Sequence, residues 1–210
     1  MNLICIDLDN TLIDSDKPHI LAYNMAFKKH NLNKVKDKKI KRFFGLVGEE
    51  IVHRLFSRLN KKEIKDIVND HDYFLHKETK KYLKTFKGVT STLRKLKERY
   101  NLALISNCRH KEILLILKTA NINSRIFSVI IGNDDVKNPK PFPDEILKAQ
   151  KLLKHKPDYM IGDSIYDIKA GKKAKVKTIA ILTGNHTKNQ LRKEHPDFIL
   201  NNFKGVLKIL

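Results

Sequence analysis

The stretch Asp7-Leu8-Asp9-Asn10-Thr11-Leu12 decides the fold of this chain and follows directly on a short apolar run, Leu3-Ile4-Cys5-Ile6. The apolar run predicts a buried strand. Side chains of an extended backbone alternate between two faces, so we expect both carboxylates on one side. One carboxylate could then attack an electrophile while the other handles the proton of the leaving group. A polar turn in which Asp9 or Asn10 caps a helix is the simpler alternative.

The composition is that of a globular protein with a sizeable core. The chain has 210 residues, of which 41% are hydrophobic, and no apolar run is long enough to cross a membrane. No basic, apolar leader precedes Asp7, and the two cysteines, Cys5 and Cys108, lie in or beside apolar runs. We therefore expect reduced cysteines and a cytoplasmic location.

The net charge of +20 arises because 43 lysines and arginines outnumber 23 acidic residues. Nucleic-acid binding is one explanation of such an excess. The lysines are nevertheless scattered, and the sequence has no arginine-rich tract, zinc-finger spacing or aromatic RNA-binding motif. The pattern favours a solvated surface over a nucleic-acid partner, and attraction of anionic substrates is a third reading.

Residues 15–87 differ in periodicity from the rest of the chain. Apolar side chains recur there at helical spacing, which predicts four or so short helices and no strand. Within this segment, Gly45 and Gly48 mark a loop or a helix start. The loop could simply turn the chain, or it could face a site as part of a lid, and the sequence does not separate these two.

From Gly88 onward, predicted helices and strands alternate. The strands are expected at 102–105, 127–131, 159–161, 178–182 and 198–200, with helices between them, one of them at 144–153. Such alternation predicts right-handed crossovers and a mainly parallel sheet covered on both faces. The predicted fold is therefore α/β, with a Rossmann-like core at 1–14 and 88–210 and an inserted helical cap domain at 15–87.

Polar residues follow several of these strands directly. Asp7, Ser106 and Asp163 all do so, which should place them at the carboxyl edge of the sheet, where open parallel sheets bind ligands. Lys140 lies in a loop with three prolines, and Asp167 comes soon after Asp163. Several acids with one cation suggest a divalent metal, and carboxylates, water and phosphate oxygens suit Mg²⁺. Each residue alone could be a helix cap or a surface residue.

Four motifs in order carry a resemblance that covers the whole chain, weakly in the helical segment. They are Asp7-Leu8-Asp9-Asn10-Thr11, Ser106-Asn107, Lys140 in its proline-rich loop, and Gly162-Asp163-Ser164-Ile165-Tyr166-Asp167. In these motifs the chain resembles the haloacid dehalogenase-like phosphohydrolases with a helical cap after the first strand. The segments around Asp167 and Gly184 resemble phosphoglycolate phosphatases most.

The resemblance implies a role for each motif. Asp7 would be the nucleophile that forms an aspartyl-phosphate, and Asp9 the acid and base. The remaining roles are phosphate binding by Ser106, Asn107 and Lys140, Mg²⁺ binding by Asp7, Asp163 and the backbone carbonyl of Asp9, and support of these ligands by Asp167 and Thr11. Related enzymes often hold the bond after the catalytic lysine in cis, so we expect a cis Lys140–Pro141 bond.

The resemblance favours a Mg²⁺-dependent phosphatase acting on a small phosphate ester, similar to phosphoglycolate. Phosphomutase, pyrophosphatase and nucleotidase activities of the same superfamily remain alternatives, as does a non-catalytic or nucleic-acid-binding module. Related sugar-phosphate mutases carry a cap arginine where this chain has Gly48, which counts against a mutase. The nine histidines show no ligand spacing and are expected at the surface or in the cap. We expect no redox role for Cys108. The sequence does not indicate an oligomeric state.

Overall fold

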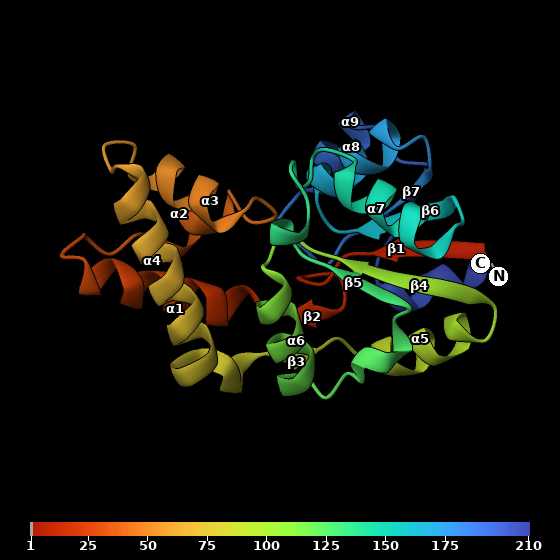
Figure 1. Cartoon of the computed structure of the whole chain (residues 1–210), viewed down its shortest axis with the longest axis horizontal. Coiled ribbons are helices and arrows are strands. Elements are labelled where there is room, and N and C mark those ends of the chain that lie inside the picture. Colours follow the sequence, from red (N-terminus) through yellow and green to blue (C-terminus); the bar gives the residue numbers. More distant parts are fainter. Residues whose placement is uncertain (1) are drawn as a thin grey trace.

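A computed structural model describes residues 2–210. At one end of the molecule it shows a sheet covered by helices, and at the other end a group of helices (Figure 1). Within these residues, the main sheet has six parallel strands in the order β5-β4-β1-β6-β7-β8. Their bounds are β1 (Asn2–Ile6), β4 (Tyr100–Ile105), β5 (Val129–Ile131), β6 (Pro157–Gly162), β7 (Lys177–Ile181) and β8 (Phe198–Leu200). The predicted α/β class with a parallel sheet is confirmed.

Helices cover both faces of this sheet, and side chains of β1 point to each face in turn. Ile4 and Ile6 belong to one apolar cluster, and Leu3 and Cys5 belong to the other. The first cluster is covered by α5 (Val89–Lys97) and α6 (His110–Thr119), and the second by α7 (Asp144–Leu153) and α8 (Ile165–Lys173). β1 is thus buried on both faces, which is why it is a continuous apolar run. A further helix, α9 (Lys188–Lys193), follows β7.

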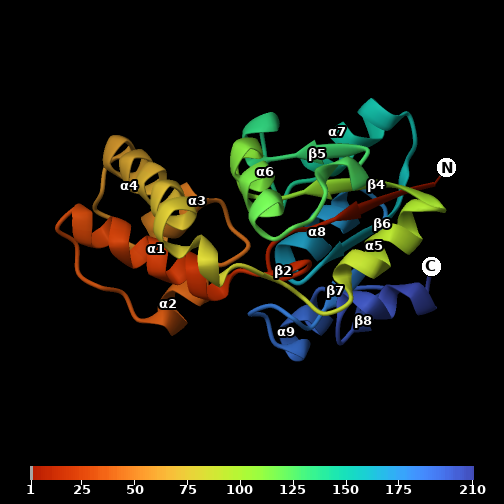
Figure 2. The same ribbon diagram turned by 90° about the horizontal axis from the view of Figure 1, so that it is seen from below.

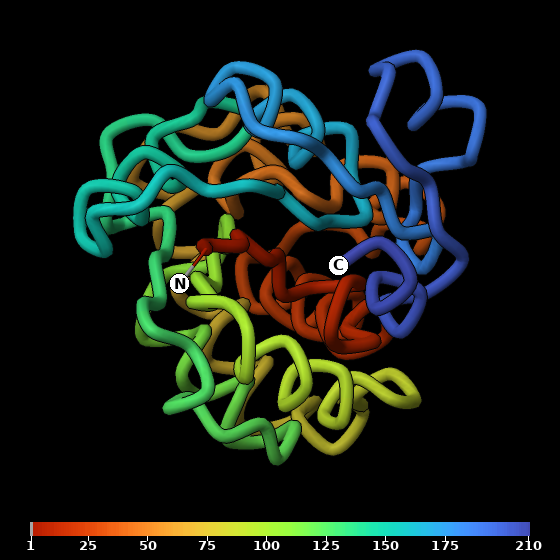
Figure 3. The backbone as a smooth tube through the Cα atoms, turned by 90° about the vertical axis from the view of Figure 1, so that its right-hand side faces the viewer, coloured from red at the N-terminus to blue at the C-terminus, as the bar shows by residue number. Residues whose placement is uncertain are grey.

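The segment after β1 forms the cap helices α1 (Asp16–Lys29), α2 (Asp37–Lys41), α3 (Gly48–Leu55) and α4 (Lys61–Phe74). They enclose an apolar cluster of their own. Figure 1 and Figure 2 both show them at one end of the molecule, outside the sheet and beside α6. Seen from the opposite end, the tube shows both chain termini on the side away from the cap helices (Figure 3).

Two short strands join the cap helices to the core. β2 (Ile13–Asp14) pairs antiparallel with β3 (Lys84–Thr85), and the backbone N–H of Phe86 donates to the carbonyl of Leu12. The expectation that 15–87 contains no strand is therefore wrong at β3. A two-residue strand is too short to show periodicity, so the pairing of the outgoing and returning chain was not visible in the sequence.

Within residues 2–210, no helix has the length and apolar character that a membrane crossing needs.

Candidate active site

The carboxyl ends of three neighbouring strands bring the predicted polar residues together. Asp7 follows β1, Ser106 follows β4 and Asp163 follows β6, and β1 lies between the other two strands. The side chains of all three residues are buried and line one pocket between the sheet edge and the cap helices. This arrangement is the one that their positions directly after apolar runs predict.

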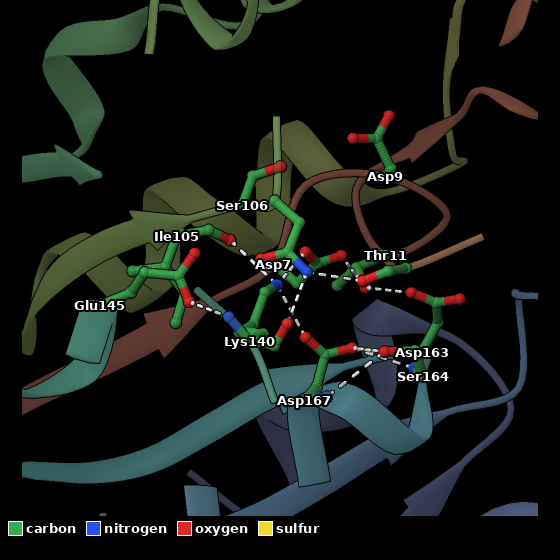
Figure 4. Close-up of polar contacts among 12 residues, drawn as sticks. Asp7, Asp9, Thr11, Ile105, Ser106, Lys140, Glu145, Asp163, Ser164 and Asp167 are labelled. Atoms are coloured by element: carbon green, nitrogen blue, oxygen red, sulfur yellow. Dashed lines mark hydrogen bonds and ion pairs between the residues drawn. The ribbon is translucent and has the colours of Figure 1, made fainter. Parts of the chain in front are cut away.

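Lys140 is the cation at the centre of this group. Its ammonium donates to Asp7 Oδ1 at 2.6 Å, to Asp167 Oδ1 at 2.8 Å and to the carbonyl of Ile105 at 3.4 Å (Figure 4). The backbone N–H of Lys140 donates to Glu145 Oε2, which fixes the loop to the first turn of α7, and the Lys140–Pro141 bond is cis as expected. The lysine is 4% exposed, and the neighbouring carboxylates hold its pKa well above its usual value despite burial.

The acids outnumber this one cation. Thr11 Oγ1 lies 3.0 Å from Asp7 Oδ2 and 3.4 Å from Asp163 Oδ1, so its hydroxyl stands between two carboxylates. Burial raises the pKa of Asp7, as do Asp167 and Asp9, and Lys140 only partly offsets this. Burial, Asp7 and Asp167 together also raise the pKa of Asp163 well above its usual value. The site therefore has an unbalanced negative charge.

A divalent cation fits this imbalance. Asp7, Asp163 and Asp167 each offer a carboxylate oxygen, and the three oxygens lie within 4.8 Å of one another. All three are hard ligands of the kind that Mg²⁺ prefers. Asp167 is the least free of them, because its second oxygen accepts hydrogen bonds from the Ser164 N–H at 3.0 Å and the Ser164 hydroxyl at 2.5 Å. Asp7 and Asp163 are thus the better placed metal ligands.

Two glycines make room for these acids. A Cβ atom at Gly162 would lie 2.2 Å from Asp167 Cγ, and a Cβ at Gly184 would lie 1.6 Å from Asp163 Oδ2. Both distances are impossible for a real side chain, so only glycine fits beside each carboxylate. The positions of Asp163 and Asp167 therefore depend on backbone from β6 and from the loop after β7.

Asp9 lines the same pocket but stands apart from the Lys140 network (Figure 4). Its carboxylate contacts His19 Nε2 from α1 at 3.3 Å and accepts from Cys108 Sγ at 3.3 Å. Although burial alone raises the pKa of Asp9, the hydrogen bond and charge of His19 outweigh it, and the pKa falls to about 2. The two carboxylates of the Asp7-x-Asp9 motif thus share a pocket and have different partners.

Sequence reasoning missed two functional candidates, His19 and His71. His19 Nδ1 lies 3.0 Å from His71 Nε2, and His71 Nδ1 lies 2.9 Å from Asp72 Oδ1. Both histidines belong to the cap helices, as expected, and both line the pocket, where His71 is buried and His19 is half-buried. They are 52 residues apart in the chain, so no ligand-like spacing could have identified the pair.

Asn107 joins the cap to the core. Its Nδ2 donates to the carbonyl of Gly45 at 2.7 Å and to the carbonyl of Lys140 at 2.9 Å. Gly45 has a φ of +95°, and a Cβ there would lie 2.8 Å from Tyr166, so glycine is needed for the loop to approach the core. The loop from Phe44 to Gly48 lines the pocket, which favours the lid over the simple turn. The Asn107 Nδ2 group is occupied by these two carbonyls, whereas its buried Oδ1 has no hydrogen-bond partner among the described residues.

The part of the pocket above the acids is lined mostly by the cap. It has apolar residues from α3 and α4 and the loop before α3, and two charged residues from the core side, Arg109 and Glu112. The Arg109 guanidinium contacts Asn69 at 2.7 Å, Glu49 at 3.1 Å and Asp72 at 3.3 Å, all on cap helices. The leaving group of any substrate bound at Asp7 would occupy this upper part.

Comparisons with known proteins agree with this geometry. The family model described as "Haloacid dehalogenase-like hydrolase" matches residues 4–181. Among curated proteins, the chain is similar to Pyrophosphatase PpaX of Bacillus mycoides, with 26% identity over all of this chain and 97% of that protein. It is also similar to the Bacillus cereus (strain B4264) protein of the same name, with 27% identity over all of this chain and 96% of that protein.

Two solved structures illustrate the similarity in fold. A hydrolase from Pseudomonas syringae has a TM-score of 0.87 at 21% identity, covering 99% of this chain and 96% of that one. A protein from Haemophilus somnus, named as a predicted phosphoglycolate phosphatase, has a TM-score of 0.90 at 24% identity, covering all of this chain and 97% of that one.

Proposed function

The chain belongs to the haloacid dehalogenase-like hydrolases, and we propose that it is a Mg²⁺-dependent phosphatase that transfers the phosphoryl group of a small metabolite to Asp7 and then to water. One observation carries the proposal. The buried Asp7 carboxylate lies 2.6 Å from Lys140 in a cluster of acids, while a second carboxylate, Asp9, faces the same pocket on separate partners. These are the two groups that a double displacement needs.

In the first step, one Asp7 oxygen attacks phosphorus and the ester oxygen leaves. Lys140 holds Asp7 Oδ1 and Thr11 holds Asp7 Oδ2, so the carboxylate is oriented before substrate arrives, and orientation supplies part of the rate. Positive charge from Lys140 also stabilises the charge on the transferring phosphoryl group. Ser106, through its hydroxyl, and Asn107, through its backbone N–H, would bind the remaining phosphoryl oxygens.

In the same step, Asp9 would give its proton to the leaving oxygen, and in the second step it would take a proton from the attacking water. The pKa of about 2 describes Asp9 with His19 beside it and no substrate. A bound phosphate dianion next to Asp9 raises the cost of its negative charge, which favours the protonated form in the complex. His19 and Cys108 fix the position of this carboxylate.

Asp7, Asp163 and the backbone carbonyl of Asp9 would hold Mg²⁺, and Asp167 and Thr11 would support these ligands. The three clustered carboxylates with one ammonium are the observation in favour. When bound, the cation supplies positive charge against the phosphoryl oxygens and against the acids themselves.

The substrate choice lies between a small phosphate monoester similar to phosphoglycolate and pyrophosphate, after which the curated relatives are named. A mutase is disfavoured at Gly48, because a Cβ there would already lie 3.1 Å from Val68, and no arginine grips a second phosphate at that position. The monoester is our first choice, because its leaving group carries less negative charge than phosphate, the upper pocket is largely apolar and acidic, and the pocket's arginine is paired with Glu49 and Asp72.

The test is phosphate release by the purified protein from a panel of phosphorylated metabolites and from pyrophosphate, with Mg²⁺ and with a chelator. We expect turnover that chelation abolishes and added Mg²⁺ restores, and none with Asp7→Asn. A covalent phosphate trapped on the wild-type protein but not on that variant would support the intermediate. Turnover that is unchanged in chelator would refute the metal requirement.

A further inference from the structure

Three side chains with different ligand chemistry meet on the cap side of the pocket. They are Asp9 from the loop after β1, His19 from α1 and Cys108 from the loop after β4. Asp9 Oδ1 is 3.3 Å from His19 Nε2, Asp9 Oδ2 is 3.3 Å from Cys108 Sγ, and one oxygen, the nitrogen and the sulfur all lie within 4.8 Å of one another. In the proposed mechanism only Asp9 transfers a proton, and His19 and Cys108 position it.

The three ligand atoms are close enough to converge on one metal ion. Zinc bonds of about 2.0–2.1 Å to nitrogen or oxygen and about 2.3 Å to sulfur place neighbouring ligand atoms about 3.3–3.6 Å apart. The two 3.3 Å contacts of Asp9 come from its two different oxygens, and one Asp9 oxygen lies within 4.8 Å of both the nitrogen and the sulfur. An ion would therefore draw the three ligand atoms together by about 1 Å.

His19 is also oriented as a metal ligand usually is. With Nε2 turned to Asp9, its Nδ1 faces His71 Nε2 at 3.0 Å, and the far nitrogen of His71 faces Asp72 at 2.9 Å. Metal-bound imidazoles commonly use the second ring nitrogen in a hydrogen bond that fixes the ring. His19 and His71 are stacked at 5.1 Å between ring centres, which restrains the ring further.

We propose that Asp9, His19 and Cys108 form a second cation site, suited to a borderline-soft ion such as Zn²⁺ and distinct from the all-carboxylate site of Asp7 and Asp163. Imidazole and thiolate favour Zn²⁺ over Mg²⁺. Binding forms one bond each to oxygen, nitrogen and sulfur, and the thiol proton of Cys108 and any proton on His19 Nε2 leave to solvent.

Occupation of this site blocks the leaving-group step. A metal-bound Asp9 carboxylate has no proton to give, so Zn²⁺ acts as an inhibitor even when Mg²⁺ occupies its own site. This inhibitory role rests on the proposed phosphatase function, whereas metal binding itself does not depend on it. The two parts are therefore measured separately.

Metal binding is tested with Co²⁺ as a spectroscopic substitute on the metal-free wild-type protein. We expect a near-ultraviolet thiolate-to-cobalt band that Zn²⁺ abolishes by displacement. Cys108→Ser, which retains Cys5, should lack the band, and His155→Ala, which removes an exposed histidine, should retain it. Absence of the band from the wild type, or its persistence in Cys108→Ser, would overturn the site regardless of any activity.

Inhibition is then measured as the Zn²⁺ concentration that halves turnover, at several Mg²⁺ concentrations. Loss of an outer partner of a metal ligand typically costs about 10–100-fold in affinity, so loss of the Cys108 ligand should raise this concentration at least about tenfold. Raising Mg²⁺ should not relieve inhibition of the wild type. Equal inhibition of wild type and Cys108→Ser, relieved by Mg²⁺ in both, would place Zn²⁺ at the carboxylate site and overturn the inhibitory role.

Discussion

Asp9 is the residue whose contribution to turnover depends most on the substrate. Asp9→Asn keeps the shape and cannot donate the catalytic proton, so turnover of alkyl phosphates should fall by about 10²–10⁴. Pyrophosphate releases phosphate, which leaves far more readily than an alkoxide and needs less protonation. The first step with pyrophosphate should therefore suffer less. Single-turnover kinetics with both substrates measure the difference, and an equal loss with both would argue against Asp9 as the acid.

Glu145 gives a prediction about stability. It is fully buried behind Lys140, and burial raises its pKa from 4.5 to about 7 although Lys140 opposes this. Because the folded pKa is the higher one, its contribution favours folding below pH 4.5 and is lost as pH rises to about 7. Glu145→Gln should remove this loss, which is at most about 3 kcal/mol at 1.36 kcal/mol per pKa unit.

The measurement for Glu145→Gln is denaturant unfolding of the metal-free protein between pH 5 and 8. The gain in free energy of unfolding of the variant over the wild type should grow across this range. In the wild type, the Lys140 N–H donates to Glu145 Oε2 at 3.0 Å, and the side-chain oxygen of Gln can still accept this hydrogen bond. Two parallel stability curves would mean that Glu145 does not take up a proton in the folded protein.

The sequence identified the site residues that directly follow strands. It did not identify site residues that come together only through contacts between distant parts of the chain. Asp7, Ser106 and Asp163 were found because an apolar run ends directly before each one. Lys140 was found because three prolines mark its loop. His19 carries no such signal, since its contact with Asp9 exists only once α1 has packed over the sheet edge.

Among the elements, the loop from Phe44 to Gly48 is the one expected to select substrates. It lines the upper pocket, and its Gly45 carbonyl accepts from Asn107 in the core. Leu46→Lys would place a cation and a longer side chain beside the leaving group, so anionic leaving groups should gain relative to neutral ones. Metal dependence should not change, because the groups at Asp7 are untouched.

The readout for Leu46→Lys is the ratio of kcat/KM values over the substrate panel. Leu21→Lys is the matched control, since Leu21 lies on α1, is 37% exposed and is outside the pocket lining. An identical substrate profile in the wild type and both variants would remove this loop from substrate selection.

The sequence predicted long elements well and short ones poorly. The helix expected at 144–153 has the same bounds as α7, because ten residues are enough to show a helical repeat. The β2–β3 pair has two residues in each strand and shows no repeat. These strands lie where the chain leaves and re-enters the core. The change in periodicity predicted crossings near residues 15 and 87, but it gave no sign of the strand pairing there.

The balance of charge in the whole molecule shows a contrast between surface and site. The chain carries +20 overall, yet its pocket gathers three carboxylates around one ammonium. An excess of scattered lysine attracts anions over long distances, and a divalent cation at the acids would let a phosphate dianion enter. The surface charge therefore needs no nucleic-acid partner to have a use.

This contrast predicts that Mg²⁺ stabilises the folded protein. At 100 times its dissociation constant, a ligand of the folded state adds about 2.7 kcal/mol, or about 5–10 °C in Tm for a chain of this size. Asp163→Asn should lose the Mg²⁺ response and melt above the metal-free wild type, because it removes a crowded carboxylate whose pKa is raised by burial, Asp7 and Asp167. Thermal melts with Mg²⁺ and with chelator decide this.

We expect the cap helices to open and close over the core, and Arg109 is placed to control this motion. This core residue reaches Glu49 on α3 and both Asn69 and Asp72 on α4. Its side chain is 27% exposed, so solvent screens these pairs and about 1 kcal/mol is a reasonable sum. Arg109→Gln should then lower the ratio of closed to open molecules about fivefold.

We expect the opened variant to raise KM about fivefold and to expose the hinge near β3 to proteases, since closure shields the site from water. Salt should move the wild type toward the variant, because exposed ion pairs weaken as ionic strength rises. Arg125→Gln, an exposed core arginine, is the control and should behave as wild type. If KM and proteolysis of Arg109→Gln match the wild type at low salt, then contacts such as that of Asn107 with Gly45, and not this ion cluster, hold the cap helices closed.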